Sequence, residues 1–250
     1  MKHSTATRAR GLTGIGLLLG LGACGTGPAP IAAPAPPAPP PLELLDVDSS
    51  FDCTDPGAFG VVTVGDDRVL QLFAAADYAP PHRSPLAIAL VDGAEFRSFV
   101  LDAEMQQTGR EYGHRDLCVI FGFESTERFY YTHLATTPDQ NAHNVFLVDR
   151  APRRNLLPPQ AAGVDWGQAE WHHIRVVRDV DEGRVQVYFD DMDTPVLDAV
   201  DATIEWGRIG FGSFDDTGMF RRLHLTDQES RPLDRSGSPF APSTAAPDGT

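Results

Sequence analysis

The chain has 250 residues, and its 20 Lys and Arg against 35 Asp and Glu give a formal net charge of −15. This balance excludes a nucleic-acid binder that works through a basic surface. Hydrophobic residues at 42% and aromatic residues at 9% are enough for one packed core, while 21 Pro and 23 Gly predict many turns and some unstructured chain.

The beginning of the chain predicts an export signal. Three basic residues precede an apolar run at 11–23, which is shorter than the roughly 20 residues of a membrane-spanning helix. The run ends in Leu21-Gly22-Ala23-Cys24, which resembles the bacterial lipobox. That resemblance implies a signal peptide at 1–23, a lipid on Cys24 and a membrane partner. By resemblance to the sorting rule of enteric bacteria, Gly25 favours the outer membrane of the cell envelope. An ordinary secretory signal cut near the same residues is the alternative.

Two further segments lack the residues for a core. Residues 28–41 contain eight Pro and five Ala, so 24–41 is expected to be a disordered, semi-rigid linker that carries the lipidated Cys. Residues 229–250 are rich in Pro, Ser, Ala and Gly and are expected to be a disordered tail. The folded domain is therefore expected at 42–228.

Within 42–228 no segment keeps a helical period, whereas short alternating or β-branched runs recur. Gly, Asp and Pro separate these runs and predict turns. The expected strands are 60–64, 68–73, 86–91, 96–105, 116–123, 129–135, 144–148, 172–178, 184–189, 208–214 and 220–225. This pattern predicts an all-β fold, a two-sheet antiparallel jelly-roll sandwich.

Several strings resemble the concanavalin A-like lectin/glucanase superfamily. Residues 171–178 (WHHIRVVR), a turn at 181–183 and 185–191 (VQVYFDD) are similar to a hairpin of that superfamily. Residues 207–214 and 117–135 are similar to strands of its laminin G-like and 3-keto-disaccharide hydrolase-like members. The resemblance implies the jelly-roll fold and a role connected with carbohydrate. The Glu-x-Asp-x-x-Glu string of laminarinase-type hydrolases does not occur here, so that chemistry is not carried over.

Side-chain parity predicts two faces for the four strands between 96 and 148. Strands 96–105 and 116–123 are expected to be antiparallel neighbours, with Glu104 opposite Asp116, and the next strands to follow with Tyr131 opposite Ile120 and Phe146 opposite His133. The expected core face holds Phe99, Leu101, Ala103, Met105, Leu117, Val119, Phe121, Phe123, Tyr130, Leu134, Val145 and Leu147. The expected polar face holds Asp102, Glu104, Asp116, Cys118, Tyr131, His133, Asn144 and Phe146.

Polar groups mixed with aromatic rings on one face are what a sugar requires, although a solvated sheet face has the same pattern. The candidate ligand-binding residues are Asp102, Tyr131, His133, His143, Asn144, Phe146 and His114. Carboxylates that face each other are destabilising unless they share a proton, a cation or a ligand, so the expected pair of Glu104 and Asp116 could act as acid and base. Together with His133 on the same face, these are the candidate catalytic residues if the protein is an enzyme.

Other residues carry weaker indications. With Cys24 lipidated, Cys53 and Cys118 are the only other thiols, and two free thiols are preferred over a disulfide. The pairs Asp190-Asp191 and Asp215-Asp216 read most simply as turns, although the superfamily resemblance makes structural calcium a candidate cofactor. Arg150, Arg153 and Arg154 form a basic cluster that could meet a uronate or sulfate, with solvated charges as the commoner explanation.

Three functions remain open. The first is a surface-anchored lipoprotein whose domain binds carbohydrate, with a neutral or modified polysaccharide as the expected ligand. The second is an enzyme of the same fold that cleaves a glycan, and the third is an adhesion or envelope-scaffold module that binds protein. No nucleic-acid partner is expected.

Overall fold

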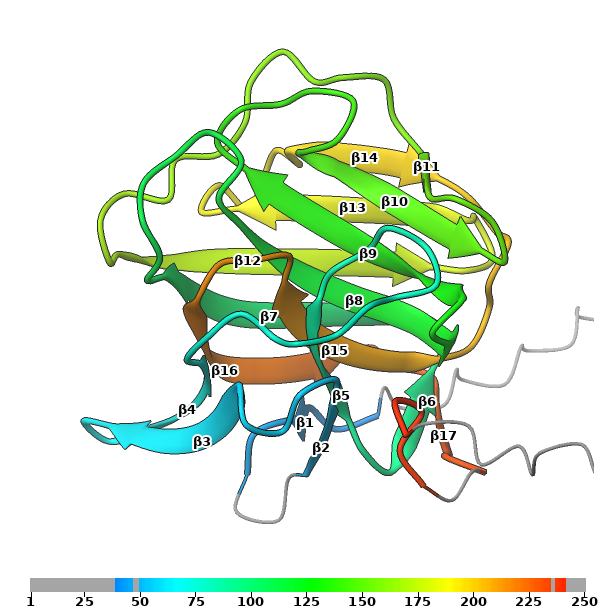
Figure 1. The fold of residues 1–250 in the computed structure, drawn as a ribbon. Coiled ribbons are helices and arrows are strands. Elements are labelled where there is room, and N and C mark those ends of the chain that lie inside the picture. Colours follow the sequence, from blue (N-terminus) through cyan, green and yellow to red (C-terminus); the bar gives the residue numbers. More distant parts are fainter. Residues whose placement is uncertain (1–38, 47–49, 235–236, 242–250) are drawn as a thin grey trace, which may run out of the picture. The chain divides into compact units, whose positions relative to one another are not determined.

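The computed structural model describes residues 39–46, 50–234 and 237–241 (Figure 1). The expected signal peptide and Cys24 lie outside the described residues, with most of the Pro-rich linker and the last residues of the expected tail. The described part contains strands and no helix. Accordingly, no helix there is long and apolar enough to cross a membrane.

The described strands are β1 (Leu42–Glu43), β2 (Phe51–Cys53), β3 (Phe59–Val64), β4 (Asp67–Leu72), β5 (Ala87–Val91), β6 (Ala94–Phe96), β7 (Phe99–Gln107), β8 (Asp116–Ser125), β9 (Arg128–Ala135), β10 (Asn144–Asp149), β11 (Arg154–Asn155), β12 (Trp171–Asp179), β13 (Arg184–Phe189), β14 (Leu197–Val200), β15 (Arg208–Ser213), β16 (Gly218–Thr226) and β17 (Ser230–Pro232). All the expected strands are present, with ends shifted by a few residues. The strands that the sequence did not reveal, β1, β2, β6, β11, β14 and β17, are too short to show a pattern.

The strands form two large antiparallel sheets that pack face to face, which confirms the expected two-sheet sandwich. The first sheet has the order β14-β13-β12-β7-β16-β4-β3, and β1 also pairs with β16. The second has the order β11-β10-β9-β8-β15-β5-β2, and β17 pairs with β6 in a small separate ladder. Figure 1 shows β7, β12 and β13 behind β8, β9 and β10.

The main core lies between the sheets, and period-two alternation places it there. In β12 the side chains alternate strictly between partly exposed and buried, with Ile174 and Val176 in the buried row. The expected core face is confirmed for Phe99, Leu101, Ala103, Met105, Leu117, Val119, Phe121, Tyr130, Leu134, Val145 and Leu147.

Phe123 is the exception, because it packs on the opposite face of β8. Gly122 has a φ of 56°, and the pairing of β8 with β9 shifts register between Phe121 and Ser125. A bulge of this kind reverses the parity of the residues that follow it.

The expected pairing of β7 with β8 is wrong. β7 pairs with β12 and β16 in the first sheet, whereas β8 pairs with β9 and β15 in the second. Residues 108–115 therefore cross from one sheet to the other, over the roughly 10 Å that separates packed sheets. Glu104 and Asp116 are not cross-strand neighbours.

Pairing within the second sheet agrees better with expectation. Ile120 is opposite Tyr131, as predicted. His133 is opposite Asn144 and Tyr131 is opposite Phe146, so the expected pair of His133 with Phe146 was wrong by two residues. A two-residue shift preserves the face of every side chain.

The outer face of the second sheet is covered and forms a second, smaller core. It contains Ile88, Leu90, Cys118, Ile120, Phe123, Phe129, Tyr131, Phe146 and Val148, with Phe214 and Phe240 packed against it. Tyr78, between β4 and β5, contacts Phe240 with ring centroids 5.8 Å apart. This face is not the solvated face that a half-exposed sheet would have.

Cys53 and Cys118 are free thiols, as preferred from the sequence, with Cys118 buried and Cys53 only partly so. The expected tail makes contacts at two places within the described residues. β17 pairs with β6, and the Phe240 ring lies 5.7 Å from that of Phe123.

Candidate functional site

A pocket of about 200 Å³ opens at one end of the second sheet's outer face. Asp116 at the start of β8 and His133 on β9 lie on that sheet, and the other lining residues come from the connections between strands. The lining residues are Arg83, Tyr112, His114, Asp116, His133, Asn141, Phe214 and Asp215.

Asp116 is fully buried, and several donors hold its carboxylate in place. The Ser213 hydroxyl donates to Oδ1 at 3.1 Å, the Cys118 thiol donates to Oδ2 at 3.0 Å, and the Phe214 N–H lies 3.4 Å from both oxygens. Burial raises the pKa of the Cys118 thiol, and the neighbouring Asp116 adds to this shift, so the thiol remains a donor. Hydrogen bonds of this kind stabilise an ionised carboxylate.

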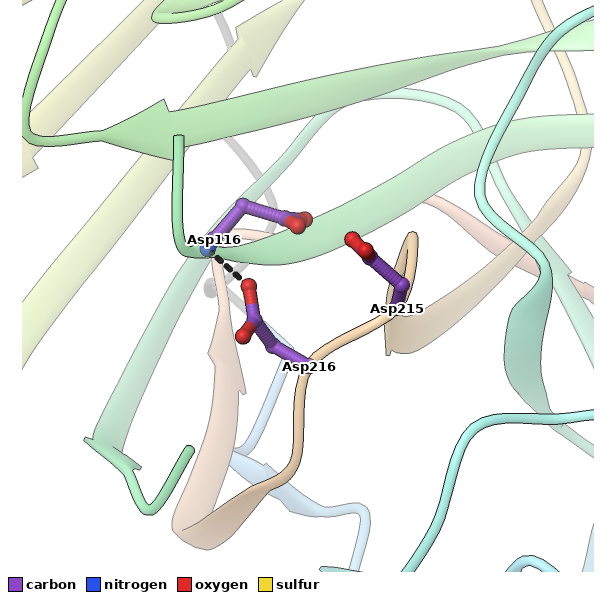
Figure 2. Close-up of side chains that lie close together, drawn as sticks. All are labelled: Asp116, Asp215 and Asp216. Atoms are coloured by element: carbon purple, nitrogen blue, oxygen red, sulfur yellow. Dashed lines mark hydrogen bonds between the residues drawn. The ribbon is translucent and has the colours of Figure 1, made fainter. Parts of the chain in front are cut away.

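Three carboxylates gather beside the pocket (Figure 2). Asp215 and Asp216 follow β15, and the Asp116 N–H donates to Asp216 Oδ2 at 2.9 Å. One oxygen from each of the three carboxylates lies within 4.8 Å of the others. Carboxylate oxygens are the ligands that hard cations prefer, so this cluster could hold a metal ion. Of the two acidic pairs noted in the sequence, the structure brings Asp116 to Asp215-Asp216 and leaves Asp190-Asp191 elsewhere.

Tyr112 connects the pocket to the buried side of the acidic cluster. Its hydroxyl donates to Asp216 Oδ2 at 2.8 Å and lies 3.2 Å from Asp215 Oδ1. Burial raises the pKa of Asp216 to about 6, and the charges of Asp116 and Asp215 add to this effect. Asp216 can therefore hold a proton close to neutral pH.

His133 contacts Asp116, and both residues were expected on the polar face. Its Nε2 is 3.5 Å from Asp116 Oδ2, and its ring makes an edge contact with Phe214 at 5.1 Å between centroids. Nδ1 is buried without a hydrogen-bond partner among the described residues. His133 is 4% exposed, so only a small part of the ring is available to a ligand.

Two other residues expected to bind ligand lie beneath the site instead. Tyr131 and Phe146 are fully buried and stacked at 5.1 Å between centroids. Arg153 covers them: its Nη1 donates to the Tyr131 hydroxyl at 2.6 Å, and its guanidinium lies 4.3 Å from the Phe146 ring centre. Arg153 also donates to the backbone and side-chain oxygens of Asn141 and so holds this lining residue of the pocket in place.

The remaining candidates near this end of the sheet have different environments. His114 is exposed, lines the pocket and pairs with Asp139 at 3.0 Å. The side chain of Asn144 exchanges two hydrogen bonds with the backbone of Leu157 and is occupied by them. Burial lowers the pKa of His143 to about 4, which keeps this residue neutral.

Asp102 and Glu104 lie on the outer face of the first sheet, away from the pocket residues. Asp102 pairs with Arg175 and accepts from His173 at 2.6 Å. Glu104 pairs with Arg221 and Arg222, and although its partial burial opposes ionisation, these two hydrogen bonds lower its pKa. The structure therefore brings Asp116, His133 and His114 together and separates Asp102 and Glu104 from them.

The sequence did not single out Arg83, Tyr112 or Phe214 as site residues. An aromatic side chain in a polar, Gly-containing connection was the available indication for Tyr112. Asp215 was assigned to a turn, which is correct, and its position beside Asp116 depends on the pairing of β15 with β8.

Comparison with known proteins gave only distant similarities. No protein-family model and no curated protein matches the chain. Among solved structures it is similar to the carbohydrate binding module CBM66 from Bacillus subtilis, with TM-score 0.49 and 13% identity over 70% of this chain and 95% of that one. It is also similar to winged bean acidic lectin in complex with methyl-α-D-galactose, with TM-score 0.48 and 10% identity over 77% and 99% of the two chains.

LamAcat from Zobellia galactanivorans is also similar, with TM-score 0.41 and 9% identity over 71% of this chain and 90% of that one. Carbohydrate-binding modules, lectins and glycosyl hydrolases thus occur among the structures that this two-sheet fold is similar to. At these scores the similarity carries no argument about ligand or activity, which must come from the site itself.

Proposed function

We propose that this chain is a lipid-anchored protein of the bacterial cell envelope whose jelly-roll domain binds a carbohydrate in the pocket beside Asp116. The observation that carries this proposal is the convergence of carboxylates, imidazoles and an amide beside the Phe214 ring. Carboxylates and amides hydrogen-bond sugar hydroxyls, while an aromatic face packs against the C–H side of a pyranose.

A glycan array probed with the full chain tests this proposal. We expect binding to at least one glycan, weakened about tenfold by Asp215→Asn because an exposed acceptor at the pocket loses its charge. Asp198→Asn on β14 is the matched control, since Asp198 is exposed and pairs with Arg184 outside the pocket. Equal effects of the two substitutions would contradict the location, and an array without hits would favour the adhesion module instead.

Catalysis is the second candidate, and one observation favours it. Asp216, whose pKa is raised to about 6, lies beside Asp116, and a carboxyl group that titrates close to neutral pH can serve as a general acid or base. Asp216 does not line the pocket, so a proton would reach it through the Tyr112 hydroxyl. Release of reducing sugar or of an unsaturated product from any glycan that binds distinguishes an enzyme from a binding module.

Calcium is our candidate ion for the cluster of Asp116, Asp215 and Asp216. Its support is the donor set of three carboxylates, one of them exposed. A bound ion stabilises the folded state by mass action, so 1 mM calcium added after chelation should raise the melting temperature if Kd is well below about 1 mM. The increase should be absent in Asp215→Asn.

A further inference from the structure

Most arginines in the described part of this acidic chain pair with a carboxylate within 4.0 Å. Arg150 and Arg154 of the basic cluster noted in the sequence are among them, paired with Asp149 and Asp201. The arginines without such a partner among the described residues are Arg68, Arg83, Arg110, Arg115, Arg153 and Arg178.

Four of these unpaired arginines surround the candidate site. Arg83 lines the pocket and is exposed. Arg110 lies 4.9 Å from the ring centre of Tyr112, which also lines the pocket, and Arg153 contacts Asn141 and Phe214 from below. In a chain with net charge −15, carboxylate partners are abundant, so unpaired cations gathered in one region are unusual.

Arg115 is the most informative of the four. It is 3% exposed, and within the described part of the chain its guanidinium makes one hydrogen bond, from Nη2 to the Gly167 carbonyl at 2.5 Å. Its Nε is buried with no acceptor among the described residues. A guanidinium has five N–H donors, and a buried charge without a counter-ion is costly, so an oxyanion bound in contact with Arg115 would satisfy donors that have no acceptor among the described residues.

Arg115 lines a groove of about 440 Å³ that shares the β7–β8 connection with the pocket. Gln107, Thr108, Gly109, Glu111, Gln168 and Ala169 complete the lining. Tyr112 and His114, from the same connection, line the pocket. Residues of one short segment therefore line both depressions, and each depression also contains an arginine without a carboxylate partner among the described residues.

We infer that the ligand is an acidic polysaccharide, whose carboxylate or sulfate groups pair with Arg83 in the pocket and with Arg115 in the groove. This inference rests on the proposed carbohydrate binding and names its ligand class. The planar guanidinium fork matches the geometry of such oxyanions, while Asp116 and Asp215 accept hydrogen bonds from hydroxyl groups of the same sugars. A polymer satisfies both arginines, because successive charged units can reach the two depressions.

The test is titration calorimetry of the full chain with alginate, polygalacturonate and a sulfated galactan, each compared with its carboxyl-reduced or desulfated form. We expect at least one acidic polymer to bind, with affinity that falls about tenfold or more on neutralisation and falls as salt is raised. The polymer that binds identifies carboxylate or sulfate as the recognised group.

Variants of the two arginines give the decisive comparison. Arg83→Gln and Arg115→Gln should each weaken binding of the acidic polymer about tenfold, while Arg184→Gln on β13, where Arg184 pairs with Asp198, should leave it unchanged. Arg115→Gln should also melt at or above the wild-type temperature, because it removes an unpaired buried charge. If it unfolds the protein, Arg115 is structural and the groove is not an anion site; Arg83→Gln then tests the pocket alone.

The outcomes separate the two proposals. Equal binding of acidic and neutral polymers, unaffected by either arginine, would overturn the acidic ligand and leave carbohydrate binding intact. Absence of binding to every polymer, acidic or neutral, would overturn both.

Discussion

Tyr131 shows at the scale of one residue how a polar side chain becomes part of a core. It lies on the outer face of β9, where the sequence predicted a ligand-binding tyrosine. Its ring is instead fully buried against Phe146, and its hydroxyl accepts a hydrogen bond from Arg153. The loss of folding stability on removing this side chain therefore depends on its burial and its hydrogen bond, and not on whether it faces the main core.

We predict that Tyr131→Ala lowers the free energy of unfolding by about 3–5 kcal/mol, similar to Phe121→Ala on the other face of the sheet, because each leaves a cavity in a packed cluster. Urea denaturation measures both. Val200→Ala, at a side chain that is 72% exposed, is the control and should stay within about 0.5 kcal/mol of wild type. A Tyr131→Ala variant as stable as this control would mean that the outer cluster is not a core.

Asp216 makes stability depend on pH in an unusual direction. Its pKa of about 6 lies above the ordinary value of 3.8, so between these pH values the unfolded chain loses the proton first and the native state loses stability as pH rises. Asp216→Asn removes this titration. We predict that the free energy of unfolding of the variant, relative to that of wild type, increases by about 1–2 kcal/mol when the pH is raised from 4 to 7.5.

Urea denaturation at the two pH values checks this. Asp198→Asn should instead lose stability relative to wild type as pH rises. Arg184 lowers the pKa of Asp198, so the ion pair in the wild type becomes stronger as pH rises. Parallel pH profiles for wild type and Asp216→Asn would contradict the proposed environment of Asp216.

At the scale of elements, the outer face of the second sheet depends on segments that are remote in the chain. Residues between β4 and β5, the residue after β15, and Phe240 near the end of the described chain cover it. The β17–β6 ladder brings the last of these segments close, and Arg231 of β17 pairs with the buried carboxylate of Glu95 on β6.

We predict that deletion of residues 229–250 lowers the melting temperature by about 5–10 °C. The deletion leaves Glu95 buried without Arg231 and uncovers Phe123, a loss of about 2–3 kcal/mol at roughly 2–4 °C per kcal/mol for a domain of this size. Calorimetry measures the change, and deletion of 242–250 alone is the control because it retains both contacts. An unchanged melting temperature would restore the domain end at Gln228 that the sequence predicts.

At the scale of the whole molecule, the proposed lipid anchor and the proposed carbohydrate site would together attach a polysaccharide to a membrane. The lipid would hold the chain at the membrane, and the Pro-rich linker would separate the sandwich from that surface. The net charge of −15 would repel the anionic headgroups of a membrane.

We predict that Cys24→Ser abolishes lipidation, because Cys24 is the only cysteine at the end of the apolar run 11–23. In detergent phase partitioning the wild type should enter the detergent phase and the variant should remain in the aqueous phase. Cys53→Ser is the matched control and should partition as wild type. Detergent partitioning of Cys24→Ser would refute the lipobox interpretation.

The sequence by itself determined the longer strands and the face of most side chains on β7, β8, β9 and β10. Alternation with period two is a local property, so β12 and the inward residues of β7 and β8 could be read directly. The exception is Phe123, which follows a bulge at Gly122 that the alternating pattern does not predict. Asp116 on β8 and His133 on β9, which line the pocket, were predicted from the same local pattern.

Only the tertiary structure decided which strands are neighbours and which polar face is covered. Strands that face each other across a sandwich present apolar residues to one core just as neighbours in one sheet do, so parity could not distinguish the two arrangements for β7 and β8. For this reason Glu104 was wrongly placed opposite Asp116. The pocket itself joins Arg83, Tyr112 and Phe214 from separate connections, and such contacts depend on chain paths that no local pattern encodes.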